Sequence, residues 1–237
     1  MNRSGKPEIK KINSKDIDTI VLGFDGTVAT ILHKAWIVTN LEALSRLANK
    51  EVTVEDELYK NFMKLGVDPE IGWRKAYLQL GGNHQDFSQT VNNMNRAEHL
   101  EFDPELSVMM ESLHEEVVKV VVFSGANYWP VIEGLSVLLK DKLAGALRTI
   151  DQIITSDVLG GNVGKPDRKA YGQMLVMCGI DPRRAVMVDD HPLEIVSAQD
   201  LGMKGVLVGD HSEAAVKKAQ PVAQIKNVHA LLSIFSD

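Results

Sequence analysis

Five short apolar runs recur along the sequence, and most of them are rich in valine or isoleucine. They span residues 17–24, 117–123, 152–155, 185–188 and 205–208. Several are nearly continuous rather than alternating with polar residues, which is typical of strands that are buried on both faces. The runs therefore predict the strands of a parallel sheet.

Segments of helical length and period separate the later runs. They cover residues 128–143, 168–178 and 193–201. Strand and helix alternate in this part of the chain, and such alternation is typical of a sheet whose strands are joined by right-handed crossovers. The pattern predicts an α/β fold with a Rossmann-like, doubly wound parallel sheet.

The interval between the first two runs breaks this alternation. It contains four helical patterns and no convincing strand, at residues 35–48, 54–65, 68–80 and 85–94. We therefore expect residues 32–100 to form a small α-helical cap domain, inserted after the first strand and able to act as a lid. Residues 1–31 and 101–237 would form the Rossmann-like core domain, with a further helix opening near Pro104.

Composition and charge narrow the classes of function. The net charge is −6, from 26 basic and 32 acidic residues, which argues against binding to nucleic acid or to acidic membranes. The single cysteine, Cys178, cannot form an intramolecular disulfide and is expected to be an inert thiol in the core. No signal-like or membrane-spanning apolar stretch is evident. A cytoplasmic location is the simplest expectation.

The polar N-terminal segment, residues 1–15, carries five basic side chains. A frayed tail is the favoured interpretation, because chain termini are commonly poorly ordered. A docking arm for an anionic partner is the alternative. Oligomeric state is left open by the sequence.

Polar residues and glycines follow the first four predicted strands. They are Asp25, Gly26 and Thr27 after the first, Ser124 and Gly125 after the second, Lys165 after the third, and Asp189 and Asp190 after the fourth. Ligands of open parallel sheets bind at the carboxyl ends of strands. A hydroxyl beside small residues suits an oxyanion. Adjacent carboxylates are costly unless a cation neutralises them, and hard oxygen ligands favour Mg²⁺.

Each of these features has an ordinary structural alternative. Asp25–Gly26 is a common turn dipeptide, and Ser124 could cap a helix. Lys165, taken alone, is expected to be a solvated surface lysine. His191 either leans over a metal or simply begins a helix. The four groups in this order together predict a phosphate site beside a divalent metal.

This order resembles the haloacid dehalogenase-like superfamily of hydrolases, over about residues 17–208. The last three positions of the family's Asp-x-Asp-Gly-Thr motif match Asp25, Gly26 and Thr27. Ser124, Lys165 and the pair Asp189–Asp190 match the second, third and fourth motifs, with Glu194 as a possible later acid. The helical insertion is similar to the superfamily's α-helical cap. The Val-Asp-Asp motif and the position of the insertion look most similar to those of phosphatases that act on nucleotides and other small phosphate esters.

The resemblance implies a role for each matching residue. Asp25 would be the general acid and base, and Ser124 and Lys165 would hold the phosphate together with Gly125, Gly26 and Thr27. Mg²⁺ would be bound by Asp190, by Asp189 and by the backbone carbonyl of Asp25. The ligand would be a small phosphorylated molecule.

One position departs from the family pattern. The family's nucleophilic aspartate is replaced by Gly23, which has no side chain to attack phosphorus or bind a metal. We do not expect Asp25, which keeps the acid and base role by resemblance, to replace it as the attacking group. A phosphohydrolase with impaired or absent activity is the main hypothesis. The alternatives are a non-catalytic relative that binds a phosphorylated metabolite, and an active enzyme from which the nucleophile was removed.

Two further sets of expectations concern chemistry at this site and in the insertion. Dehalogenase chemistry, also found in the superfamily, needs the same aspartate and is weakened equally. In the insertion, aromatic and basic side chains could contact a substrate: Trp36, Tyr59, Trp73, Arg74 and Tyr77. We favour the interpretation that the aromatic side chains pack the core of the small helical domain.

Overall fold

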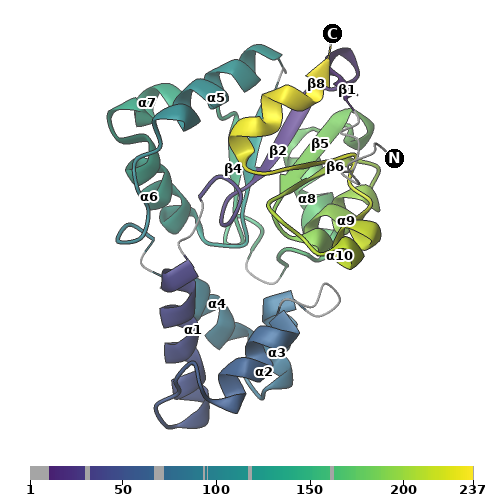
Figure 1. Cartoon of the computed structure of the whole chain (residues 1–237). Coiled ribbons are helices and arrows are strands. Elements are labelled where there is room, and N and C mark those ends of the chain that lie inside the picture. The colour runs from purple at the N-terminus through teal and green to yellow at the C-terminus, as the bar shows by residue number, and fades with distance from the viewer. Residues whose placement is uncertain are drawn as a thin grey trace, which may run out of the picture. The chain divides into compact units, whose positions relative to one another are not determined.

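The chain divides into two compact units, residues 1–30 with 102–237, and residues 31–101. The computed structural model describes residues 11–29, 33–66, 72–92, 94, 96–116, 119–160 and 163–236 (Figure 1). The inserted unit extends one residue beyond the expected range of 32–100 at each end. Each unit is described separately below.

A six-stranded parallel sheet forms the centre of the first unit, in the order β4-β3-β2-β5-β6-β7. Its strands are β2 (Thr19–Gly23), β3 (Lys119–Phe123), β4 (Gln152–Ile154), β5 (Ala185–Asp189), β6 (Lys204–Val208) and β7 (Ala223–Ile225). Five of them coincide with the predicted apolar runs, and β7 was not predicted. The expected α/β fold with a Rossmann-like parallel sheet is confirmed.

Helices cover both faces of this sheet. Figure 1 shows α5–α7 on one side and α8–α10 on the other. The helices are α5 (Pro104–Glu116), α6 (Tyr128–Leu139), α7 (Leu143–Ala146), α8 (Arg168–Cys178), α9 (Pro192–Gln199) and α10 (Glu213–Ala219). The short 3-10 helices are η1 (Ser14–Asp16), η2 (Lys140–Lys142), η3 (Pro182–Arg184) and η4 (Val228–Ile234). The helix expected over residues 128–143 ends at Leu139, because Lys140 adopts a positive φ of 44°.

Alternation along the strands decides which side chains meet which helices. Val21 and Met187 pack in one core cluster with residues of α8 and α9, whereas Ile20 and Val186 are fully buried on the opposite face. Residues two positions apart on a strand share a face. Gly23 and Asp189 therefore continue the face that α8 and α9 cover.

The N-terminal residues that the structure describes are ordered by pairing. Strand β1 (Ile12–Asn13) pairs in parallel with β8 (Phe235–Ser236), and η1 follows directly. The prediction of a frayed tail over residues 1–15 is therefore wrong for residues 12–15, because the chain's two ends form a small separate sheet. The first ten residues lie outside the described part of the chain, so three of the five basic side chains of the proposed docking arm do too.

The second unit is helical, with α1 (His33–Ala48), α2 (Glu57–Gly66), α3 (Gly72–Gln79) and α4 (His84–Asn92) in its described part. Its own core includes Tyr59, Phe62 and Tyr77, and the rings of Phe62 and Trp73 lie 5.4 Å apart. The prediction that the aromatic residues pack this core is confirmed for Tyr59, Trp73 and Tyr77. The side chain of Trp36 falls outside the described residues. Among the helices described in either unit, none is long and apolar enough to span a bilayer.

Candidate functional site

The carboxyl ends of three neighbouring strands bring most of the predicted site residues to one edge of the sheet. Strand β2 pairs with β3 and with β5, so that Gly23 lies opposite Phe123 and Leu22 lies opposite Val188. The segments that follow these strands therefore start side by side. They carry Asp25, Ser124 and the acidic pair that begins at Asp189.

A tight loop follows β2. The backbone N–H of Ala29 donates to the carbonyl oxygen of Phe24 at 2.8 Å, and that of Gly26 donates to the carbonyl of Ala29 at 2.7 Å. Gly26 has a positive φ of 79°, and a Cβ atom there would overlap the carboxylate of Asp190. Glycine is thus required at this position both by the backbone conformation and by the close approach of Asp190. Asp25 is half-buried in the same loop.

Thr27 joins this loop to the end of β5. Its hydroxyl accepts a hydrogen bond from the backbone N–H of Asp190 at 3.0 Å and donates to Oδ1 of the same residue at 3.2 Å. Burial and the neighbouring charge of Asp189 raise the pKa of the Asp190 carboxyl to about 8. Asp190 therefore faces the β2 loop.

Ser124 lies in the turn between β3 and α6 and is 3% exposed. Its Oγ accepts a hydrogen bond from the backbone N–H of Ala126 at 3.0 Å, and its own N–H donates to the carbonyl of Ile154. The residue that caps α6 is Asn127, so the helix-cap alternative for Ser124 is wrong. Gly125 in the same turn is exposed, and a Cβ atom added there would meet open space.

Lys165 is buried, with only 7% of its side chain exposed. Its Nζ donates to Oδ2 of Asp189 at 2.6 Å and to the carbonyl oxygen of Phe123 at 3.3 Å. Burial lowers the pKa of the ammonium group, but the carboxylates of Asp189 and Glu194 outweigh it and hold the pKa above its usual value. The alternative of a solvated surface lysine is therefore wrong.

A second carboxylate and a phenol complete the surroundings of Lys165. Oε2 of Glu194, on α9, lies 3.7 Å from Nζ and accepts a hydrogen bond from the hydroxyl of Tyr171. Burial raises the pKa of the Glu194 carboxyl to about 7, although Lys165 opposes the shift. Burial also raises the pKa of Tyr171. Tyr171 was not predicted, because on an apolar helix face it is indistinguishable from a core aromatic.

The carboxylate of Asp189 lies over Gly23. Gly23 has no positive φ, so its backbone would accept a side chain, but a Cβ atom there would lie 3.0 Å from both Cγ of Asp189 and Oγ1 of Thr27. It would be closer still to Oδ2 of Asp189. The other carboxylate oxygen of Asp189 accepts from the backbone N–H of His191 at 2.9 Å. Both oxygens of the predicted metal ligand Asp189 are thus engaged by protein groups.

The predicted ligands of Mg²⁺ lie at the ends of β2 and β5. Asp190 and the backbone carbonyl of Asp25 are hard oxygen donors of the type Mg²⁺ prefers. Among the described residues, however, no three side chains of His, Cys, Asp or Glu gather in a way that could hold a metal ion. His191 is the N-cap of α9, and its Nδ1 accepts from the N–H of Leu193, which confirms the helix-start interpretation.

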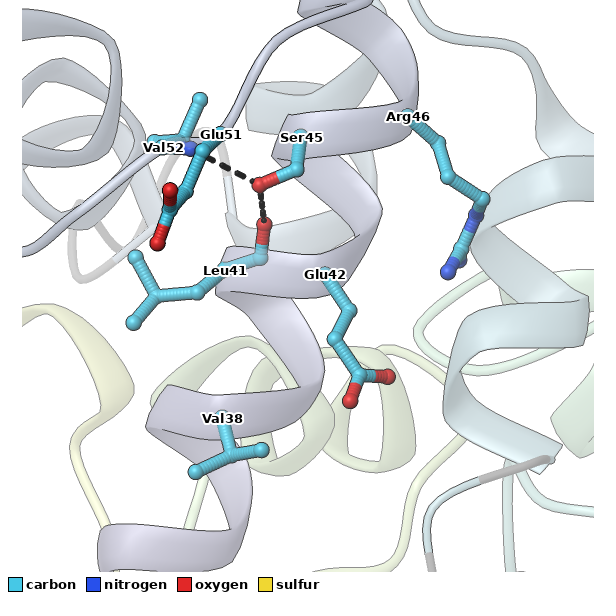
Figure 2. A pocket seen from close by; sticks show the side chains of 7 residues that line it. All are labelled: Val38, Leu41, Glu42, Ser45, Arg46, Glu51 and Val52. Atoms are coloured by element: carbon cyan, nitrogen blue, oxygen red, sulfur yellow. Dashed lines mark hydrogen bonds between the residues drawn. The ribbon is translucent and has the colours of Figure 1, made fainter.

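An open hollow of about 480 Å³ lies on the second unit, and none of the predicted site residues lines it. Figure 2 shows its seven lining side chains, of which the hydroxyl of Ser45 bonds to the backbone of Leu41 and Val52. The lining includes Glu42, Glu51 and Arg46, so it carries charges of both signs. The mixed charge does not favour an anionic ligand there.

Fold and site together define a Rossmann-like α/β protein with polar groups gathered at its strand ends and a helical insertion after its first core strand. Residues 20–208 match the profile of the haloacid dehalogenase-like hydrolase family. Because this match covers most of the chain, the protein belongs to that family. The family resemblance expected from the sequence is confirmed.

Solved structures share the fold at low sequence identity. A haloacid dehalogenase-like family hydrolase from Streptococcus pneumoniae aligns with a TM-score of 0.63 and 13% identity, over 92% of this chain and 98% of that one. A protein assigned as a β-phosphoglucomutase from Thermotoga maritima aligns with a TM-score of 0.60 and 17% identity, over 92% of this chain and 98% of that one. A 2-haloacid dehalogenase from Pseudomonas syringae aligns with a TM-score of 0.53 and 20% identity, over 92% of this chain and 97% of that one. No curated protein sequence matches the chain significantly.

Proposed function

We propose that the protein is a phosphatase-type member of its family that binds a small phosphate ester, such as a nucleotide, at the strand ends. Its turnover is impaired or absent because Gly23 offers no nucleophile. The observation that carries the proposal is the buried ammonium group of Lys165, 3.3 Å from the carbonyl of Phe123, the residue before Ser124. A fixed cation beside a hydroxyl-bearing turn with exposed backbone suits a phosphate group.

For the other residues we propose the roles that the family resemblance implies. Ser124, Gly125, Gly26 and Thr27 would surround the phosphate oxygens, as hydroxyl and backbone donors. Asp25 would give a proton to the leaving alcohol. With these groups alone, phosphoryl transfer would depend on a water molecule as attacker, and removal of a covalent nucleophile commonly costs several orders of magnitude in rate.

Mg²⁺ is the proposed companion ion. The carboxylate of Asp190 and the backbone carbonyl of Asp25 would hold it, and it would neutralise charge on the bound phosphate. Mg²⁺ in proteins commonly keeps several waters and relies on one or two carboxylates together with substrate phosphates. We therefore expect weak binding of Mg²⁺ alone and tighter binding in the presence of phosphate.

The dehalogenases among the structural neighbours make a haloacid the competing substrate class. A panel of small phosphate esters and 2-haloacids, assayed with and without Mg²⁺, separates the two. The proposal expects slow or undetectable release of phosphate, no release of halide, and a rise in melting temperature with inorganic phosphate and Mg²⁺.

Two variants test where the phosphate binds. Ser124→Ala should remove most of the stabilisation by phosphate, whereas Ser233→Ala, at an exposed serine on η4, should leave it unchanged. A protein that is not stabilised by phosphate and releases no phosphate contradicts the proposal. Stabilisation with slow turnover supports an impaired enzyme, and stabilisation with no detectable turnover fits both an inactive enzyme and the non-catalytic binding alternative.

A further inference from the structure

Gly23 and Asp189 compete for one volume. They end adjacent strands, β2 and β5, whose preceding residues Leu22 and Val188 are register partners. The two positions also share the face of the sheet that α8 and α9 cover. A side chain at position 23 would collide with the Asp189 carboxylate as it now stands, since even a Cβ atom would lie 3.0 Å from its Cγ.

The carboxylate of Asp189 also supplies the counter-charge for the buried ammonium group of Lys165. Lys165 is buried, and an unpaired buried ammonium group would be strongly destabilising. With glycine at position 23, strand β2 supplies no counter-charge. Oδ2 of Asp189 lies 2.6 Å from Nζ, much closer than the carboxylate of Glu194 at 3.7 Å.

We propose that Asp189 has taken over the place of the carboxylate that position 23 lacks. It fills the volume over Gly23 and pairs with Lys165, so the site's anion comes from β5 rather than β2. Asp189 is then a positioning residue, not a nucleophile, because Lys165 and the N–H of His191 occupy its two oxygens. A phosphate that enters the site must share Lys165 with this internal anion.

The spatial part of the proposal is tested by a double-mutant cycle in melting temperature, with Gly23→Ala, Asp189→Ala and the double variant. Gly23→Ala should lower the melting temperature of the native chain by about 4 °C or more. In the Asp189→Ala background the same change should cost about 1 °C or less. Gly125→Ala, at a glycine where an added Cβ atom would have no neighbour within 4 Å, gives the baseline change in melting temperature for an added methyl group.

The electrostatic part rests on the proposed function and is tested with inorganic phosphate as the probe. Asp189→Asn keeps the shape of the side chain but removes its charge, so Lys165 is freed for the ligand. Phosphate affinity, measured by calorimetry, should rise at least about threefold. Asp141→Asn makes the same change of net charge at an exposed site on η2 and should leave the affinity unchanged.

The outcomes separate the two ideas. Equal costs of Gly23→Ala in both backgrounds would overturn the replacement of one carboxylate by the other. A fall in phosphate affinity for Asp189→Asn would overturn the role of Asp189 as a competing anion, because a merely structural residue gives that result. A clear coupling with no phosphate binding in any variant would support the replacement and overturn the proposed phosphate site.

Discussion

The hydroxyl group of Thr27 both accepts a hydrogen bond from Asp190 and donates one to it. Oγ1 of Thr27 accepts from the backbone N–H of Asp190 and donates to its carboxylate, and Thr27 is 2% exposed. The contact joins the loop after β2 to the end of β5, which are 163 residues apart in the chain. It therefore fixes two predicted site segments relative to each other.

Replacement of Thr27 by valine should destabilise the protein, because the buried N–H of Asp190 loses its acceptor. The expected cost is about 1–3 kcal/mol in the free energy of unfolding, measured with urea. Thr27→Ser retains the hydroxyl and should cost clearly less. Similar losses for the two variants would show that packing of the methyl group, rather than the hydrogen bonds, makes Thr27 important.

Gly26 and Gly160 form a matched pair for the effect of close approach. Both have a positive φ, 79° and 85°, but only Gly26 has a neighbour, the Asp190 carboxylate. Gly160→Ala should cost about 1–2 kcal/mol for the backbone conformation alone. Gly26→Ala should cost at least about 1 kcal/mol more in the same unfolding experiment. Equal costs would mean that Asp190 moves aside freely.

Glu194 should make the fold less stable as pH rises. Burial raises the pKa of its carboxyl in the folded protein to about 7 from an ordinary value of 4.5, so the folded protein binds the proton more tightly than the unfolded chain does. Its contribution is complete below about pH 4.5 and is lost as pH rises through about 7. Between these two pH values, the free energy of unfolding of the Glu194→Gln variant should rise by roughly 2–3 kcal/mol relative to that of the native chain. Exposed Glu133→Gln should show no such pH-dependent gain.

Cys178 should react slowly with thiol reagents in the folded protein. Burial raises the pKa of its thiol to about 11, although Lys119 opposes the shift, and the residue is 4% exposed. At about pH 8 the reaction with a disulfide reagent should be roughly 100-fold slower than for an exposed thiol. Addition of a denaturant should restore the fast rate. Fast reaction of the native protein would contradict the burial of Cys178.

Restoring aspartate at position 23 should not by itself produce an efficient enzyme. In the Gly23→Asp variant the new side chain meets the Asp189 carboxylate, so two carboxylates crowd one buried lysine. The variant Gly23→Asp with Asp189→Ala should release phosphate from an ester at least about tenfold faster than Gly23→Asp alone. Equal or higher activity of the single variant would show that Asp189 moves away at little cost.

Much of the fold follows from local pattern. Helix α8 was predicted with its observed bounds, residues 168–178, from its helical period, and in the structure Asp167 caps it and Gly179 ends it in the left-handed conformation. Strand β7 escaped prediction because Ala223–Ile225 contains only one branched apolar residue. The pairing of β1 with β8 also escaped, because two-residue strands at opposite ends of the chain leave no periodic signal.

The site was predictable in its members but not in its pairings. Asp189 and Asp190 are adjacent in the sequence, which suggested joint binding of one metal ion. Adjacent residues at a strand end point to opposite sides, so Asp189 meets Lys165 while Asp190 meets Thr27. Glu194 and Tyr171 join the same buried cluster through helix packing, which no short motif encodes.

The overlap between a side chain at position 23 and the carboxylate of Asp189 also affects the order in which substitutions at these two positions could accumulate in evolution. Any lineage that gained an acid at position 23 would pass through a crowded intermediate, which we expect to be less stable, unless position 189 had changed first. The order of the two substitutions therefore matters, and selection acting one step at a time would tend to keep Gly23. A difference of a single codon can in this way become hard to reverse.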